Sequence, residues 1–172
     1  MTEKLKEIIS LIEKSGEIIS LLEKGREKVN ADAAGALDPI EGAAYIARTA
    51  REQIKRKGAA ATAYHELVNE QARGLRRFLD ENKENESEES EAMGKLFLSL
   101  YEAHEECEKV VRHYDYLFAK FNTITRLIGE ASSELRLIDT LDHDGPEWAQ
   151  NAADAAVTEI EEFIEVISSD FY

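Results

Sequence analysis

The chain contains few of the residues that interrupt helices or cross-link a fold. Of its 172 residues, two are proline, nine are glycine and one is cysteine. This scarcity of proline, together with the absence of clusters of β-branched residues, argues against a fold built from sheets. The single cysteine, Cys107, cannot form an intrachain disulfide, and its place in a helical stripe of apolar residues indicates a buried, reduced thiol. We therefore expect a cytoplasmic protein.

Long apolar runs are also missing. No stretch of about 18 apolar residues occurs, so the sequence predicts no transmembrane helix and no membrane partner. The first seven residues carry too many charges for a signal peptide. With 43% hydrophobic and 33% charged residues, the composition is typical of a globular or coiled-coil protein. The length suits a single domain, which we assign to residues 1–172.

Motifs that carry catalysis are absent or incomplete. The sequence has no paired Glu-x-x-His motifs, no zinc-ligand spacing and no glycine-rich phosphate loop. Glu102-x-x-Glu105 and Glu159-x-x-Glu162 match the first half of the pattern by which all-α nucleotide pyrophosphohydrolases hold magnesium, but no Glu-x-x-Asp follows. We predict a protein that is not an enzyme, with no catalytic, metal or cofactor-binding residues. A metal-dependent all-α pyrophosphohydrolase is retained as an alternative.

Helical periodicity dominates what is present. Its longest example runs over residues 93–138, where apolar residues recur mostly at steps of three and four. This inner face comprises Met93, Phe97, Leu100, His104, Cys107, Val111, Tyr114, Phe118, Phe121, Ile124, Ile128, Ala131, Leu135 and Ile138. Everything else in the chain is expected to pack against this face.

Three further segments show the same periodicity. The predicted helices cover about residues 2–29, 39–80, 92–140 and 146–169. Asp38-Pro39 is read as the capped start of the second helix, which either kinks at Gly58 or runs through it. Expected inner faces are Leu5, Ile8, Ile12, Ile19, Leu22 and Val29 in the first helix; Ile40, Ala43, Ala47, Ala50, Ile54, Ala61, Tyr64, Val68, Gln71, Leu75 and Phe78 in the second; and Trp148, Ala152, Ala156, Ile160, Phe163 and Ile167 in the last.

These helices predict an all-α, antiparallel bundle of about four long helices with a projecting coiled-coil hairpin. The hairpin consists of the second and third helices, joined by an acidic turn at residues 80–91. Because two helices alone bury little surface, we expect a partner or self-association near this turn.

The net charge of −15 is distributed unevenly. Residues 1–79 carry 14 Lys and Arg against 12 Asp and Glu, whereas residues 80–172 carry 7 against 24. Such an excess of carboxylates disfavours direct nucleic-acid binding and favours a protein partner with a basic surface. The predicted function is a non-enzymatic protein–protein interaction module whose acidic face comprises Glu102, Glu105, Glu106, Glu159, Glu162 and Glu165. The alternatives are a homo-oligomer and an acidic nucleic-acid mimic, of phage or mobile-element type, that inhibits a nucleic-acid-binding enzyme.

Two isolated polar residues remain open to interpretation. His104 is the one histidine in the long apolar face, and Glu159 lies near the inner face of the last helix. They either form a buried pair or reach solvent separately. Tyr116 is expected to be exposed and available to a partner.

Overall fold

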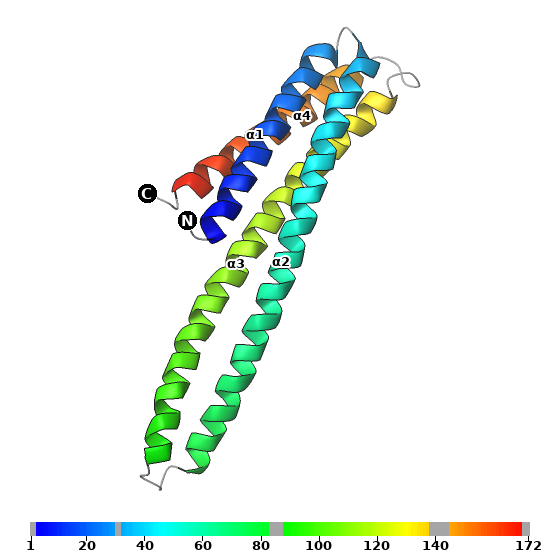
Figure 1. The fold of residues 1–172 in the computed structure, drawn as a ribbon. Coiled ribbons are helices and arrows are strands. Elements are labelled where there is room, and N and C mark those ends of the chain that lie inside the picture. The colour runs from blue at the N-terminus through cyan, green and yellow to red at the C-terminus, as the bar shows by residue number, and fades with distance from the viewer. Residues whose placement is uncertain (1–2, 30–31, 83–87, 138–144, 170–172) are drawn as a thin grey trace. The chain divides into compact units, whose positions relative to one another are not determined.

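A computed structural model describes residues 3–29, 32–82, 88–137 and 145–169. These residues form four helices and no strand: α1 (Glu3–Val29), α2 (Ala33–Glu81), α3 (Glu88–Leu137) and α4 (Gly145–Ser169) (Figure 1). The predicted all-α bundle of four helices is thereby confirmed. None of the described helices is long and apolar enough to cross a membrane.

The chain divides into two compact units. The first, called here the bundle, consists of residues 1–53 and 118–172. The second, called here the hairpin, consists of residues 54–117. Both α2 and α3 contribute one part to each unit, so the two units can be compared within the same helices.

The bundle has a continuous apolar core. In α1 the buried positions recur at steps of three and four, at Ile8, Leu11, Ser15, Ile18, Leu22, Gly25 and Val29. The predicted inner residues Ile12 and Ile19 are only half-buried. The apolar face of α1 is wide enough that either of two neighbouring rows of residues could be buried. The structure buries the row that contains Gly25, which lies against Ile40: a Cβ added at Gly25 would be 2.6 Å from Cγ1 of the isoleucine.

The start of α2 differs from the prediction. The helix begins at Ala33, and Asp32 caps it by accepting a hydrogen bond from the backbone N–H of Gly35 at 2.9 Å. The predicted start at Asp38-Pro39 is therefore wrong, and Pro39 lies inside the helix. At this position Pro39 has no backbone N–H to donate to the carbonyl of Gly35, so the first turns of α2 lack one intrahelical hydrogen bond.

The other two helices close the core. In α3 the predicted residues Phe121, Ile124, Ile128, Ala131 and Leu135 are all buried, and Ile138 lies outside the described residues. In α4 the core residues are Ala149, Ala153, Ala156, Ile160, Phe163 and Ile167. Trp148 is 64% exposed, which contradicts its predicted place on the inner face. Its neighbour Ala149 continues the buried spacing instead, and the small side chain permits close packing.

The hairpin pairs residues 54–81 of α2 with residues 88–117 of α3 in antiparallel orientation (Figure 1). No break occurs at Gly58, since α2 is one helix, and an added Cβ there would lie 3.2 Å from Cβ of Tyr114. The contact positions form one seam on each helix, called here the inner seams. They are residues 54, 58, 61, 65, 68, 72, 75 and 79 of α2 and 93, 97, 100, 104, 107, 111 and 114 of α3, all buried or half-buried.

Candidate interaction surface

The hairpin buries little apolar surface. Of the 25 buried apolar residues in the described chain, only Ile54, Val68 and Leu117 belong to it. Each helix of a two-helix pair can hide only the side that faces its neighbour. The remaining apolar side chains of this unit must therefore lie partly in solvent.

Those side chains form a second, regular pattern. Six of them precede an inner-seam residue by one position: Tyr64, Leu67 and Phe78 on α2, and Leu96, Ala103 and Val110 on α3. The other residues at such positions in the hairpin are Lys57, Ala60, Gln71 and Gly74 on α2, and Ala92, Ser99, Glu106 and His113 on α3. Tyr64, Leu67, Leu96 and Val110 are exposed, and Phe78 and Ala103 are half-exposed. We call these six residues the outer seam. On α3 its members recur every seven residues, which is the repeat of a helix that packs against a partner helix.

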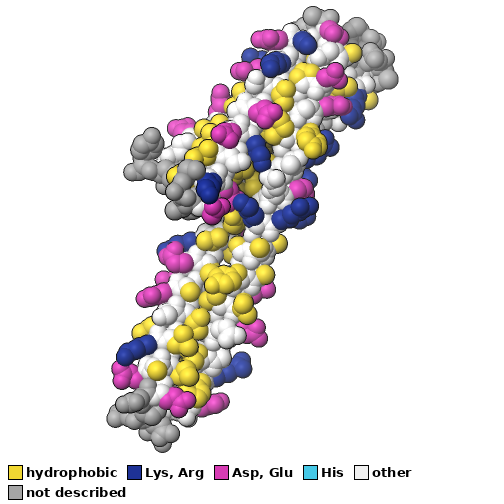
Figure 2. All heavy atoms as spheres, viewed as in Figure 1, with side chains coloured by type: hydrophobic (Ala, Val, Ile, Leu, Met, Phe, Trp, Pro, Cys, Tyr) yellow, Lys and Arg dark blue, Asp and Glu magenta, His cyan; other side chains and the backbone are white. Residues whose placement is uncertain are grey.

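The outer-seam residues of both helices face the same side of the hairpin. A residue one position before a seam residue is rotated from it by about 100° around the helix axis. Because α2 and α3 run antiparallel, the same rotation on each helix turns both sets to one side. Figure 2 shows the result as a band of hydrophobic side chains along the unit that is teal to green in Figure 1.

The opposite side of the hairpin is mostly polar. The residues that follow the inner seam of α2 are Lys55, Ala59, Thr62, Glu66, Asn69, Arg73, Arg76 and Asp80. A shallow groove on this helix is lined largely by polar and charged side chains. Leu98 and Tyr101 of α3 are exposed apolar exceptions. The contrast between the two sides marks the outer-seam side as the candidate surface for a protein partner.

The six predicted acidic residues are divided between the two units. Glu102, Glu105 and Glu106 lie in the hairpin and are exposed, whereas Glu159, Glu162 and Glu165 lie in the bundle. Glu106 accepts a hydrogen bond from Lys109 at 2.6 Å. In the bundle, Lys120 Nζ lies 2.6 Å from a Glu159 oxygen and 3.6 Å from a Glu162 oxygen. Among the described residues, no ion pair involves the other three, Glu102, Glu105 and Glu165.

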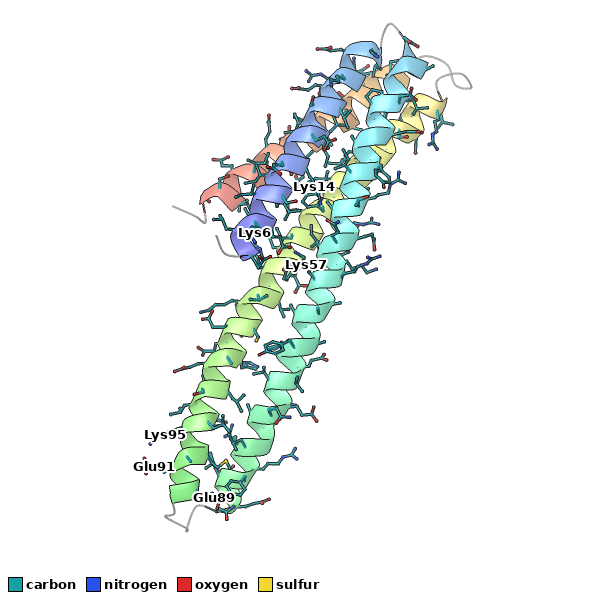
Figure 3. The ribbon with its side chains drawn as sticks, viewed as in Figure 1. Lys6, Lys14, Lys57, Glu89, Glu91 and Lys95 are labelled. Atoms are coloured by element: carbon teal, nitrogen blue, oxygen red, sulfur yellow. The ribbon has the colours of Figure 1, made fainter. Side chains whose placement is uncertain are left out.

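Ion pairs along α3 also shift pKa values. The hydrogen bond from Arg112 holds the pKa of Glu108 below its usual value, and the hydrogen bond to Glu106 raises the pKa of Lys109. Nearer the start of the helix, Lys95 donates to Glu91 at 2.7 Å, and Figure 3 shows both side chains pointing away from α2. These exposed pairs neutralise part of the acidic surface and contribute little to stability.

The polar residues that the sequence left open have different partners. His104 lies against His65, with 3.0 Å between their Nε2 atoms, and Glu159 accepts from Lys120. The hypothesis of a His104–Glu159 pair is replaced by these two contacts. Tyr116 is half-buried, and its buried hydroxyl has no hydrogen-bond partner among the described residues, so its predicted exposure is wrong.

The sequence analysis missed His65 and the outer seam. It placed Tyr64, Gln71 and Phe78 on the inner face of α2, which is wrong for Tyr64 and Gln71, because both are exposed, whereas Phe78 is half-buried beside the inner seam. The signal for the outer seam was available in the spacing: Leu96, Ala103 and Val110 repeat every seven residues beside the face that was recognised. Among the described residues, no group of three or more His, Cys, Asp or Glu side chains is placed to hold a metal ion. Comparisons of the chain with protein-family models, curated proteins and solved structures find no match.

Proposed function

We propose that the protein is a non-enzymatic protein–protein interaction module that binds through the outer seam of its hairpin. The observation that carries this proposal is the row of exposed and half-exposed apolar side chains that α2 and α3 share on one side of the hairpin, next to a mostly polar opposite side. A second layer of helices would bury this side and convert the two-helix hairpin into a four-helix bundle.

We assign a second copy of the same hairpin as the partner, on the basis of charge. Residues 54–81 of α2 carry six Lys and Arg against four Asp and Glu, and residues 88–117 of α3 carry three against eight. A two-fold axis parallel to the hairpin places α2 of each copy beside α3 of the other. The acidic helix then meets a basic one, and all neighbouring helices are antiparallel.

The size and shape of the surface suit such a dimer. About 28 helical residues span roughly 40 Å, and two helices side by side are about 20 Å wide. The resulting area of roughly 800 Å² per copy equals that of a standard protein–protein interface. At matching levels, Tyr64 would contact Val110 of the second copy, and Leu67 would contact Ala103 of the second copy. A large side chain thus opposes a smaller one at both levels.

The acidic-mimic alternative has weaker support. A mimic needs carboxylates that are free to replace phosphates, whereas Glu106, Glu159 and Glu162 lie in ion pairs. Of the two Glu-x-x-Glu motifs that a pyrophosphohydrolase would use, Glu159 and Glu162 both contact Lys120, whereas Glu102 and Glu105 have no ion pair among the described residues. These contacts favour the interaction module over either alternative.

Two leucines of α3 provide a matched test. Leu96 belongs to the outer seam and is 50% exposed, whereas Leu98 is 62% exposed on the other side. Sedimentation equilibrium of the full chain should give twice the 19.4 kDa chain mass. Leu96→Glu should give the monomer mass, since each dimer would bury two new carboxylates in an apolar contact. Leu98→Glu should leave the dimer unchanged.

Salt distinguishes the assigned charge pairing from apolar contact alone. Association between the basic α2 and the acidic α3 should slow as salt increases, because the Debye length falls from about 10 Å at 0.1 M to about 3 Å at 1 M. A wild-type chain that remains monomeric at high concentration would contradict self-association. Equal dissociation by both leucine substitutions would contradict the outer seam as its site.

A further inference from the structure

The hairpin brings together two histidines that are 39 residues apart in sequence. His65 of α2 and His104 of α3 both occupy inner-seam positions, and their Nε2 atoms lie 3.0 Å apart. We propose that these two imidazoles chelate one divalent transition-metal ion of the Ni²⁺ or Cu²⁺ class, which links α2 to α3. This assignment does not depend on the proposed dimer.

The distance between the nitrogen atoms fits two ligands of one ion. Imidazole nitrogen binds such ions at about 2.0–2.1 Å, so a separation of 3.0 Å corresponds to an angle of roughly 95° at the ion. That value is closer to the 90° between neighbouring ligands of a tetragonal site than to the roughly 109° of a tetrahedral one. Tetragonal nitrogen and oxygen sites favour Cu²⁺ and Ni²⁺, which also bind more tightly than earlier divalent ions of the series.

The ring arrangement requires only a small rearrangement to bind. The ring centroids are 4.5 Å apart with 45° between the planes. When both rings are neutral, one Nε2–H donates to the other Nε2. Moving that proton to Nδ1 of the same ring frees both Nε2 lone pairs for the ion, with no net proton release. Water would fill the remaining ligand positions, since both residues are half-buried and reachable from solvent.

The surroundings favour a cation at this point. Each histidine comes directly after an outer-seam residue in the sequence, His65 after Tyr64 and His104 after Ala103. Glu108 lies one turn after His104, on the side of α3 opposite to the outer seam. Its carboxylate bonds Arg112, and its charge interacts with both histidines. The excess of carboxylates on residues 88–117 adds attraction for a divalent ion. Chelation across 39 residues would restrain the two helices against separation.

Isothermal titration of the untagged full chain with NiCl₂ and CuCl₂ tests the site. We expect saturable binding of one ion per chain. His65→Ala and His104→Ala should each weaken it by about tenfold or more, because loss of one ligand ends chelation. His113→Ala is the control, since His113 lies on the same helix and packs against Tyr114 instead. Circular dichroism checks that each variant folds, and a variant that does not fold is replaced by the glutamine variant at the same position.

Amide hydrogen exchange gives a second readout. Saturating Ni²⁺ should slow exchange in residues 54–117 of the wild-type chain and leave His65→Ala unchanged. Absence of saturable binding, or equal affinity in the wild type and both single variants, would overturn the proposal. Loss of binding in His113→Ala alone would place the ion elsewhere and would also overturn it.

Discussion

The bundle and the hairpin use the same two long helices with different results. In the bundle, α2 and α3 are joined by α1 and α4, and 22 of the 25 buried apolar residues belong to this unit. In the hairpin each helix has a single neighbour, and side chains such as Tyr64 and Leu67 are exposed. The comparison teaches that burial here is set by the number of neighbouring helices and not by apolar periodicity, which is strong in both.

Side-chain size follows the same division. The bundle part of α2 buries a row of small residues: Ala36, Ala43, Ala44, Ala47 and Ala50. Small side chains let several helices approach closely, as a crowded core requires. The hairpin part of α2 instead carries Tyr64, Leu67 and Phe78 on its outer seam. Large apolar side chains that remain wholly or partly exposed in the described chain are the usual mark of an interface.

The largest contrast is expected from truncating one large side chain in each unit. Phe163 is fully buried and contacts Phe121 edge to face, with 5.3 Å between ring centroids. Phe163→Ala should lower the free energy of unfolding by about 3–5 kcal/mol. Leu67→Ala should change the stability of the monomeric chain by less than about 1 kcal/mol, because Leu67 is already exposed. Urea denaturation at low protein concentration measures both, and similar losses would contradict the division between the units.

A smaller contrast separates two glycines of α1. An added Cβ at Gly25 would lie 2.6 Å from the side chain of Ile40, whereas nothing lies within 4 Å of one at Gly16. Gly25→Ala should destabilise the bundle by about 1–3 kcal/mol through overpacking. Gly16→Ala should stabilise it by about 0.5–1 kcal/mol, because alanine favours the helix. Thermal unfolding monitored by circular dichroism gives both signs. A stabilising Gly25→Ala would show that α1 and α2 do not pack this closely.

Much of the fold could be predicted from periodicity alone. The four helices and most of the α3 and α4 core residues follow from steps of three and four, whereas the same steps left open whether α2 kinks at Gly58 or runs through it. Where two registers were equally apolar, periodicity could not choose between them. Ile12 and Ile19 of α1 were preferred over Leu11 and Ile18, and the choice depended on the close approach at Gly25, which only tertiary packing determines.

Local signals misled at two helix starts. Asp38-Pro39 has the composition of a capped start, but Asp32 provides the cap. The alanine-rich residues between Asp32 and Asp38 are already helical. Trp148 was assigned to the core by its hydrophobicity, although Ala149 has the correct spacing. The candidate site was harder to predict, because the His65–His104 contact and the shared side of the outer seam depend on how α2 and α3 align, which neither helix encodes alone.

The smallest expected effect compares one ion pair in each unit. In the bundle, Lys120 and Glu159 are 2.6 Å apart, and their side chains are 23% and 24% exposed. In the hairpin, Lys95 and Glu91 are separated by a similar distance of 2.7 Å, but their side chains are 74% and 71% exposed. Exposed pairs are screened by water and salt, whereas partly buried carboxylates depend on their partner for solvation.

Lys120→Met should therefore destabilise the chain by about 1–2 kcal/mol, mainly because Glu159 would remain half-buried without its cation. Lys95→Met should leave the unfolding midpoint unchanged within experimental error. The double variant Lys120→Met with Glu159→Gln should recover part of the loss, since an uncharged amide tolerates this site better than an unpaired carboxylate. Urea denaturation of the three variants measures the effects. Equal midpoints for Lys120→Met and Lys95→Met would show that the bundle shields its ion pairs no better than the hairpin does.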